Sequence, residues 1–501
     1  MNVDRKSDGS VVPAKPTNKD AVDASAELAE LAEERDPAKR NVEQDAVPRT
    51  PSRKESKSRG LLGVREAARK DSKLRSTALL HHIDRDALGL AFNQLKKGAA
   101  VGVDGVTWQD YEQNVEVNLA DLPGRIHRGA YRAKPSRRCW IPKSDGRQRP
   151  LGIAALEDKL VQQAVATVLQ CIYEEDFIGF SYGFRPGKSQ HNALDALSVA
   201  ITSKRVNWIL DADIEGFFDA IDHDWLIKFL EHRIGDRRIL RLIRKWLRAG
   251  VSEDGEWSRT TVGAPQGAVI SPLLSNVYLH YVFDLWIEWW RTKHCHGDVI
   301  VIRYADDFVI GFQNRDEAER CLEELRQRLA KFGLKLHDGK TRLIEFGRYA
   351  AENRKRRGEG KPETFDFLGF THKCSQTRAH GYFTIHRHTI VKRVRATLAA
   401  IKLELRRRRH RPLGETGRWL GRVVGGWLNY HAVPGNTWTG SFVHEVTRHW
   451  LRAIGRRSQK GRSRWTWERM KRLREKYLPR ACVIHPYPNV RFRARLEAGA
   501  V

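Results

Sequence analysis

The chain has 501 residues, a formal net charge of +29 at pH 7 and a hydrophobic fraction of 41%. This length accommodates roughly three domains of about 150 residues each, and the apolar share suffices for folded cores, so a wholly disordered chain is excluded. The six cysteines stand far apart without a Cys-x-x-Cys pair, which excludes a zinc module and a disulfide framework. No apolar run reaches the roughly 18–20 residues of a membrane span, and no secretory signal is visible, so we expect a reduced, cytosolic protein.

The excess of positive charge predicts a polyanionic partner, and it is concentrated at one end of the chain. Residues 371–501 contain 30 lysines and arginines against 6 aspartates and glutamates. Such a run is often only a solvated face, but here the arginines alternate with aromatic side chains, which stack well on unpaired bases. These aromatic residues are Trp427, Tyr430, Trp438, Trp450, Trp465 and Trp467. The pattern favours a nucleic-acid partner for the C-terminal quarter.

The first 60 residues contain 12 basic and 12 acidic side chains and no aromatic residue. A segment of this composition buries too little apolar surface to offset the entropy of ordering, so we predict a disordered tail over residues 1–60. Globular patterns begin near Leu80. Residues 140–370 alternate predicted strands, such as 208–213 and 299–303, with helices such as 159–173.

After Gly381 the sequence is typical of helices almost throughout. Apolar residues recur at three- and four-residue spacing from Ile390 to Leu405, which predicts an amphipathic helix ending in Arg406–Arg409. Two more helical segments are predicted around 418–431 and 441–454. We therefore expect an α+β protein whose C-terminal part is helical.

The sharpest chemical signal is a pair of adjacent carboxylates between two apolar runs. Residues 299–311 read Val-Ile-Val-Ile-Arg-Tyr-Ala-Asp-Asp-Phe-Val-Ile-Gly, which predicts a hairpin with Asp306 and Asp307 at its tip. Aspartate is also common in plain polar turns. However, adjacent carboxylates without a turn glycine repel each other, and a divalent cation relieves that repulsion.

A second acidic strand end precedes this hairpin. In Trp208–Asp219, Asp211 and Asp213 flank Ala212 and therefore share one face of a strand. Magnesium prefers oxygen ligands and usually bridges one or two carboxylates to substrate phosphates. Two such strands side by side predict a two-metal site for phosphoryl transfer, in which one ion activates the attacking hydroxyl and the other stabilises the leaving group.

Further motifs surround these carboxylates in a fixed order. Tyr304-Ala305-Asp306-Asp307 resembles the Tyr-x-Asp-Asp box of reverse transcriptases, and Asp213 with Phe218 resembles their first carboxylate box. Other boxes of these polymerases are similar to Ile141-Pro142-Lys143, Arg149–Ile153, Ala264–Gly267 with Ile270–Asn276, Leu334–Thr341 and Phe365–Phe370. Tyr182–Ser189 resembles the form typical of group II intron proteins, and Trp427–His431 resembles the signature of their maturase domain.

Over roughly residues 80–480 the chain is thus identified as a member of the group II intron-encoded reverse transcriptase/maturase family. The resemblance implies a right-hand polymerase of class α+β, with fingers, a palm containing an antiparallel sheet, and an all-helical thumb or maturase domain. The domains expected are a disordered tail (1–60), an N-terminal extension (61–130), fingers and palm (131–372), the thumb (385–476) and a short basic tail (477–501). The implied activity is RNA-directed DNA synthesis, together with assistance to intron splicing and retromobility.

The resemblance also implies roles for single residues. Asp213 and Asp306 bind two Mg²⁺ ions, for which Mn²⁺ can substitute, Asp307 supports them, and the Ile214 carbonyl completes one metal shell. Phe218 rejects a ribose 2′-hydroxyl. Contacts with the nucleotide or primer are implied for Lys143 and Arg149 at the triphosphate, Gln266 and Gly267 near the incoming base, Tyr304 beside the primer end, and Lys340 as a candidate proton donor to pyrophosphate.

Binding of RNA is predicted at Arg406, Arg407, Arg408, Arg409, Trp427 and Tyr430. The implied partners are the group II intron RNA, an RNA template with a DNA primer, target DNA and deoxynucleoside triphosphates, with a homodimer as a further candidate and no membrane. The implied location is the bacterial cytoplasm or nucleoid. Many relatives carry a C-terminal endonuclease module with paired cysteines, whereas residues 481–501 contain only Cys482, so we expect that module to be absent.

Two alternatives stay open. One is a polymerase-inactive RNA chaperone that only assists splicing; the intact Asp213, Asp306 and Asp307 argue against it, since burying unused carboxylates is costly. The other is a bacterial reverse transcriptase domesticated for repair or defence, against which the Tyr182–Ser189 and Trp427–His431 motifs argue.

Overall fold

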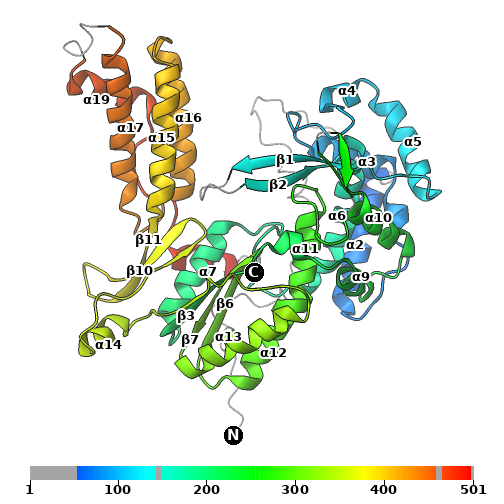
Figure 1. Ribbon diagram of the computed structural model, residues 1–501, viewed down its shortest axis with the longest axis horizontal. Helices are drawn as coiled ribbons and strands as arrows, with labels where there is room; N and C mark the ends of the chain where they lie inside the picture. The colour runs from blue at the N-terminus through cyan, green and yellow to red at the C-terminus, as the bar shows by residue number, and fades with distance from the viewer. Residues whose placement is uncertain (1–52, 143–147, 254, 259, 459–464, 498–501) are drawn as a thin grey trace, which may run out of the picture.

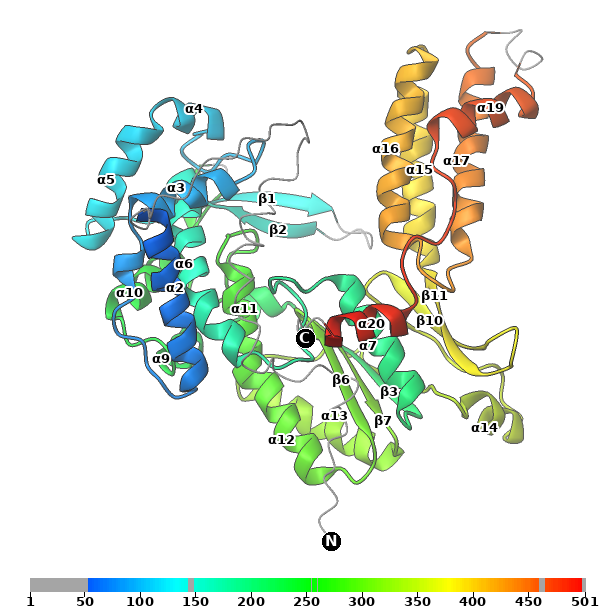
Figure 2. The same cartoon turned by 180° about the vertical axis from the view of Figure 1, so that it is seen from behind.

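The computed structural model describes residues 53–142, 148–253, 255–258, 260–458 and 465–497. Within these described ranges the fold is α+β with three β-sheets, in agreement with the predicted class. Figure 1 shows a central sheet, with an N-terminal helical region and its own small sheet on one side and a bundle of long helices on the other. The two flanking parts stay on opposite sides of the central sheet in the reverse view of Figure 2.

The N-terminal helical region is built around α6, whose side chains are buried along most of its length. Side-chain caps fix where other helices begin: Asp84 accepts hydrogen bonds from two backbone N–H groups of α3, and Thr107 forms a capping box with Asp110. The elements are α2 (Arg53–Lys70), η1 (Leu80–His82), α3 (Arg85–Gln94), α4 (Trp108–Gln113), α5 (Val115–His127), α6 (Leu156–Asp176), α9 (His223–Glu231) and α10 (Arg237–Arg248). Helix α2 thus starts inside the tail predicted for 1–60, and residues 1–52 lie outside the described part.

The small sheet of this region has the strand order β2-β1-β4-β5. Its hairpin consists of β1 (Ser136–Pro142) and β2 (Gln148–Ile153), which pair in antiparallel fashion, and β4 (Val251–Glu253) with β5 (Glu256–Ser258) extends it. The hairpin loop that contains Lys143 lies outside the described residues.

The central sheet is antiparallel, with the order β6-β7-β3-β8. Its strands are β3 (Trp208–Asp213), β6 (Val299–Tyr304), β7 (Asp307–Phe312) and β8 (Arg342–Glu345). Strands β6 and β7 are buried over nearly their whole length, as their continuous Val/Ile runs require. The helices around this sheet are α7 (Gln190–Ser203), α8 (Phe217–Ala220), α11 (Ser271–Leu279), η2 (His280–Asp284), α12 (Leu285–His294) and α13 (Arg315–Ala330).

A third sheet, of order β11-β10-β9, connects the central sheet to the bundle. It contains β9 (Phe365–Phe367), β10 (Phe370–Gln376) and β11 (Phe383–Thr389), and α14 (Ala350–Arg356) precedes it. The prediction of helix directly after Gly381 is therefore wrong for β11. Its side chains alternate between buried and half-buried from Ile385 to Thr389, a period of two that the basic composition of the region concealed.

The helical bundle consists of α15 (Val391–Arg407), α16 (Leu413–His431), α17 (Trp438–Gly455) and α19 (Trp467–Tyr477). The predicted apolar stripe of α15 is confirmed, since Val394, Ile401 and Leu405 lie in a separate hydrophobic core. Beyond the bundle the chain returns to the central sheet, where α20 (Pro488–Glu497) lies against α7 (Figure 2). No helix in the described ranges has both the length and the apolar character that would let it span a bilayer.

Candidate active site

The acidic ends of two neighbouring strands lie side by side in the central sheet. Strand β3 ends at Asp213, strand β7 begins at Asp307, and these two residues are direct partners in the antiparallel register. Asp307 is also paired with Tyr304 across the β6–β7 hairpin. The hairpin turn is Ala305-Asp306, with a positive φ of 58° at Ala305, the backbone sign that a type II′ hairpin turn requires at its first position. The structure therefore brings Asp213, Asp306 and Asp307 together.

The electrostatics of this cluster disfavour three negative charges at once. Partial desolvation, reinforced by Asp306 and Asp213, raises the pKa of Asp307 to about 7, although part of its side chain stays in contact with solvent. Desolvation also raises the pKa of Asp306, with a contribution from Asp213. Burial raises the pKa of Asp211 to about 6 in spite of its ion pair with Arg342 at 3.5 Å. A cation bound near these carboxylates would therefore stabilise their ionised forms.

Lys340 supplies one such cation. Its Nζ forms an ion pair with Asp213 Oδ2, and it follows a turn in which His337 N donates to the Asp213 carbonyl at 2.8 Å. Within the described ranges, no three His, Cys, Asp or Glu side chains converge as a preformed metal cage. This agrees with the chemistry of Mg²⁺, which commonly uses one or two carboxylates and takes its other ligands from water and substrate phosphates.

The Ile214 carbonyl is also available near these carboxylates. Ile214 forms an isolated antiparallel bridge with Leu336. The hydrogen bonds around this bridge use the Asp213 carbonyl and the Glu215 N–H, which donates to Lys335 O at 2.8 Å. The carbonyl of Ile214 takes no part in these two bonds, so it can act as an oxygen ligand.

Phe218 lies just beyond β3, against the loop that contains Gln266 and Gly267. Its half-buried ring meets Phe217 edge-on, with centroids 5.5 Å apart, and its carbonyl accepts a hydrogen bond from Ala264 N at 2.8 Å. Gly263 has a φ of 93°, and a Cβ there would lie 3.0 Å from the Phe218 carbonyl oxygen. Close backbone packing therefore fixes the position of Phe218.

The same loop is bonded to β2. Gly152 N donates to the Gln266 carbonyl at 2.7 Å, and Gly267 has a φ of 103°, where a Cβ would lie 3.2 Å from the Gly152 carbonyl oxygen. Strand β2 also carries the exposed Arg149, whose charge lowers the pKa of Asp306 and so opposes the effect of desolvation. Arg149 and the Gln266 loop thus belong to one connected surface, whereas Lys143 lies outside the described residues.

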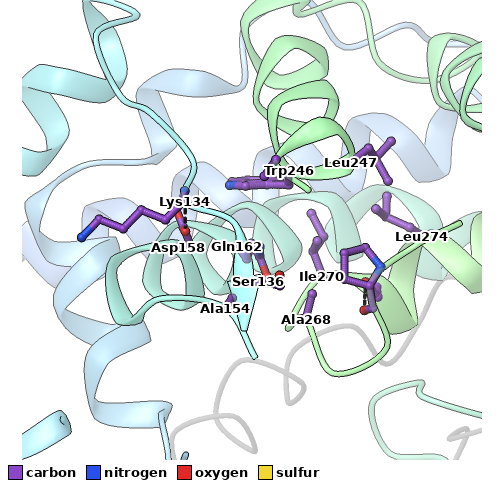
Figure 3. A pocket seen from close by; sticks show the side chains of 13 residues that line it. Lys134, Ser136, Ala154, Asp158, Gln162, Trp246, Leu247, Ala268, Ile270 and Leu274 are labelled. Atoms are coloured by element: carbon purple, nitrogen blue, oxygen red, sulfur yellow. Dashed lines mark hydrogen bonds between the residues drawn. The ribbon is translucent and has the colours of Figure 1, made fainter. Parts of the chain in front are cut away.

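A narrow pocket lies behind this loop (Figure 3). Gln162 Oε1 accepts a hydrogen bond from Val269 N at 3.0 Å, and Asp158 accepts one from Lys134 N at 3.0 Å. Burial raises the pKa of Asp158 to about 6. None of the described lining residues is a strand-end carboxylate or a predicted nucleotide contact. The residues that line the pocket therefore support the loop that contains Gln266 and Gly267, and the pocket is not part of the carboxylate site.

Two features of the site were missed by sequence reasoning. Phe184 is exposed, has a positive φ of 58°, and its ring centroid lies 6.5 Å from that of Tyr304. Arg303 is completely buried, and its guanidinium bonds to the Ala305 carbonyl. The signal for Arg303 was a single cation inside an otherwise apolar strand. Phe184 lies within the Tyr182–Ser189 motif, but no local pattern indicated that its ring lies beside Tyr304.

The predicted RNA contacts are distributed differently from the expectation. Trp427 is only 8% exposed and stacks on Phe442 at 3.8 Å, so its ring belongs to the bundle core and is not available to RNA; this prediction is corrected. Tyr430 is largely engaged as well, since its hydroxyl donates to Leu368 O at 2.7 Å. The two aromatic residues of this Trp-x-x-Tyr pattern pack inside the protein. The composition of the segment alone could not show whether their rings are buried or exposed.

The four arginines at the end of α15 also divide into two groups. Arg408 pairs with Glu404 at 2.7 Å and lies over the Trp419 ring at 4.9 Å, and Arg409 is half-buried. Arg406 and Arg407 are exposed, with only a 3.7 Å pairing between Arg407 and Glu404. The exposed pair is the part of the run that is accessible to a polyanion.

The segment that contains this site matches a known protein family. Residues 141–372 match the family model described as reverse transcriptase (RNA-dependent DNA polymerase). This segment contains the strands β3, β6, β7 and β8 and all three clustered carboxylates.

Several individual proteins are also similar in sequence to this chain. Protein YkfC of Escherichia coli is 36% identical over 281 residues, which cover 49% of this chain and 73% of YkfC. The group II intron-encoded protein LtrA of Lactococcus lactis subsp. cremoris is 36% identical over 196 residues, covering 39% of this chain and 32% of LtrA. An uncharacterized 91 kDa protein in the cob intron of Schizosaccharomyces pombe is 31% identical over 275 residues, covering 54% and 34%. The match thus spans about a third of the length of the last two relatives.

Proposed function

This chain belongs to the reverse transcriptase family and is of the group II intron-encoded type, and we propose that it is an RNA-directed DNA polymerase that also binds its intron RNA and assists splicing and retromobility. The observation that carries the polymerase activity is the register of the central sheet, in which Asp213 and Asp307 are direct partners and Asp306 occupies the adjoining turn.

The right-hand assignment follows the arrangement seen in Figures 1 and 2. We assign the palm to the central sheet, the fingers to the β1–β2 hairpin with its surrounding helices, and the thumb to the helical bundle. The proposed boundaries are 61–130 for the N-terminal extension, 131–372 for fingers and palm, and 385–476 for the thumb. The tail at 477–501 includes α20, which packs back onto the palm.

The donor set at the strand ends fits divalent cations. Asp213 and Asp306 would hold two Mg²⁺ or Mn²⁺ ions, with Asp307 beside them and the Ile214 carbonyl as a further oxygen. Ions bound there would supply activation of the primer 3′-hydroxyl and charge stabilisation of the pyrophosphate leaving group. Lys340 is the proposed proton donor to the departing pyrophosphate, and its ion pair with Asp213 supports this role.

The surrounding residues select and orient the nucleotide. Arg149, together with Lys143, binds the triphosphate, because a guanidinium fork and an ammonium point charge both suit phosphate oxygens. The loop of Gln266 and Gly267 packs under the incoming base, and the Phe218 ring excludes a ribose 2′-hydroxyl. Tyr304 contacts the primer end.

The second activity depends on binding to RNA. Matches to intron-encoded proteins support intron RNA as the partner, and the exposed Arg406 and Arg407 support a contact on the bundle. The remaining proposed partners are an RNA template with a DNA primer, target DNA and deoxynucleoside triphosphates.

The experiment for this proposal is primer extension. Purified protein should extend a DNA primer on an RNA template with Mg²⁺ or Mn²⁺ and should lose the activity when the ions are chelated. If the protein binds intron RNA and promotes its splicing but never extends a primer under any divalent-ion condition, it is the polymerase-inactive chaperone instead.

A further inference from the structure

The turn that carries Asp306 has a backbone conformation that its sequence does not favour. Ala305 has a φ of 58°, a region in which a residue with a Cβ is strained. Ala305 is nearly buried, at 6% exposure, and lies directly between Tyr304 and Asp306. Such a conformation persists only where surrounding contacts hold it, so neighbouring groups must supply those contacts.

Arg303 makes the most direct of these contacts. It precedes the turn on β6, is 0% exposed, and its Nη1 donates to the Ala305 carbonyl at 3.0 Å. The rest of the guanidinium is also engaged. Nη1 donates to Asn276 Oδ1 at 2.9 Å, while Nε and Nη2 donate to the two carboxylate oxygens of Asp284 at 2.6 and 2.5 Å. The planar fork is therefore fixed in one orientation.

Asp284 lies in an irregular part of its helix. Residues 271–294 form a nearly continuous helix whose middle turn, η2 (His280–Asp284), is a π-helix. A π turn inserts a residue into the α-helical repeat and so changes which face the following side chains occupy; such turns are frequent at functional sites. Asp284 is the last residue of this turn and is completely buried.

A second set of contacts packs the loop of residues 182–189 onto the turn. Asn276 Nδ2 donates to the Gly183 carbonyl at 2.7 Å, so the same asparagine links Arg303 to the loop of residues 182–189. A Cβ at Gly183 would lie only 2.2 Å from Ala305 N, which means that the loop packs directly on the turn. The backbone of Arg303 is bonded to this loop region as well, through Phe180 and Tyr182 at 2.9 Å each.

We propose that Arg303, held by Asp284 and Asn276, is a positioning residue that fixes the positive φ of Ala305 and thereby the location of the Asp306 carboxylate. This proposal rests on the proposed polymerase function. An ordinary buried ion pair would affect only the stability of the fold when it is broken. A positioning residue should in addition affect the turnover rate.

The test begins with Arg303→Lys. Lysine keeps the positive charge but cannot donate to both Asp284 oxygens, Asn276 and Ala305 in one fixed fork. We expect kcat for primer extension to fall by about tenfold or more, which corresponds to at least about 1.4 kcal/mol of lost transition-state stabilisation. Affinity for primer–template and KM for the nucleotide should change little, because Arg303 is buried away from both.

Rescue distinguishes positioning from general stability. Glycine adopts a positive φ at little cost, so Ala305→Gly relieves the strain that Arg303 counteracts. In a double-mutant cycle, Arg303→Lys should therefore lower kcat several-fold less in the Ala305→Gly background than in the wild-type background. The matched control is Arg387→Lys, which weakens another buried Arg–Asp pair, Arg387–Asp195 at 2.7 Å. Its effects should not be altered by Ala305→Gly.

Two further measurements keep the proposal falsifiable. Gly183→Ala leaves the ion pair intact but presses on the turn, so it should lower kcat in the same way, even if Arg303→Lys fails to fold. Titration with Mn²⁺ followed by electron paramagnetic resonance should show weaker ion binding in both variants, independently of DNA synthesis.

If the wild type binds Mn²⁺ but makes no DNA, the proposed polymerase function is wrong while the proposal for Arg303 survives. Unchanged kcat and Mn²⁺ affinity in folded Gly183→Ala, or equal losses in both backgrounds of the cycle, would overturn it.

Discussion

At the scale of single residues, the site balances charge repulsion against the need for oxygen ligands. Asp306 and Asp307 are consecutive, and Asp213 is the register partner of Asp307, so three carboxylates lie at two strand ends and the adjoining turn. Desolvation, reinforced by the neighbouring carboxylates, raises the pKa values of Asp306 and Asp307, and Asp213 forms an ion pair with Lys340. The arrangement is unfavourable without cations, and this is the physical reason to expect that divalent ions organise it.

Phe218 allows a test of nucleotide selection at the same scale. Its ring is half-buried beside Phe217, and its backbone is fixed by Ala264 and Gly263. Phe218→Ala should open the space needed by a 2′-hydroxyl, so ribonucleotide incorporation relative to deoxynucleotide should rise by about tenfold or more, roughly 1.4 kcal/mol. Competition between the two nucleotides in primer extension measures the ratio. Phe217→Leu, a change in the buried neighbour, is the control, and equal discrimination by wild type and Phe218→Ala would show that Phe218 serves the core alone.

At the scale of secondary-structure elements, α16 joins the bundle to the third sheet through a buried histidine. His431 ends α16, packs between Trp427 and Phe370, and shares a hydrogen bond of 3.2 Å between its Nδ1 and Thr389 Oγ1. Burial, reinforced by Arg393, lowers the pKa of His431 to about 4. The folded state therefore holds this imidazole neutral at pH values where the unfolded chain, with a pKa near 6.5, binds a proton.

The resulting pH dependence has a defined sign. The contribution of His431 to the free energy of unfolding is fully present above about pH 6.5 and is lost as the pH falls toward about 4. Between pH 7 and pH 4.5, the decrease in unfolding free energy should be smaller in His431→Phe than in wild type by about 1–3 kcal/mol. Urea denaturation of the metal-free protein measures this difference. The exposed His410→Phe serves as the control, and parallel pH profiles of wild type and His431→Phe would contradict the argument.

The end of α15 is the element that carries the predicted RNA contact. Arg406 and Arg407 are exposed, whereas Arg408 is bound to Glu404 and Trp419. Changing Arg406 and Arg407 together to Ala should weaken binding of a group II intron RNA and should flatten the plot of log affinity against log salt by about 0.7–0.9 for each phosphate that is no longer neutralised. Filter binding at several salt concentrations measures both quantities. Arg408→Ala should instead lower stability, and an unchanged salt slope in the double variant would identify the arginines as a solvated helix end.

At the scale of the whole molecule, the C-terminal segment ties the bundle to the central sheet. Asp195 on α7 is 2% exposed and pairs with Arg387 of β11 at 2.7 Å and with Arg491 of α20 at 3.2 Å. Three parts of the chain that are distant in sequence therefore share one buried carboxylate. Removing a single member of such a cluster leaves the remaining charges buried without compensation.

Asp195→Asn should accordingly destabilise the protein by about 3–5 kcal/mol, the usual cost of breaking a buried ion pair. Thermal or urea unfolding measures the change. Glu415→Gln removes an exposed pairing with Arg411 at 2.7 Å and should cost no more than about 1 kcal/mol. Equal stability of the two variants would mean that Asp195 does not hold these segments together.

The sequence predicted those parts of the molecule whose signals are local. The apolar runs around Asp306 and Asp307 were sufficient for the β6–β7 hairpin, and periodic apolar residues were sufficient for α15. Features that depend on distant partners were not predictable. Arg303 pairs with Asp284 of a π-helical turn, Trp427 stacks on Phe442 of another helix, and β11 pairs with β10, and each of these partners is distant in sequence or conformationally unusual.

Catalysis of RNA-directed DNA synthesis by the strand-end carboxylates can be checked with a single substitution, Asp306→Asn. This change keeps the shape of the side chain but removes the charge that binds a cation. On an RNA template with a DNA primer and Mg²⁺, the variant should lose DNA synthesis by about a thousandfold or more, while Asp316→Asn, at an exposed position on α13, should retain it. Intron RNA binding and thermal stability should stay close to those of wild type. DNA synthesis by Asp306→Asn within tenfold of wild type would refute the catalytic role of these carboxylates.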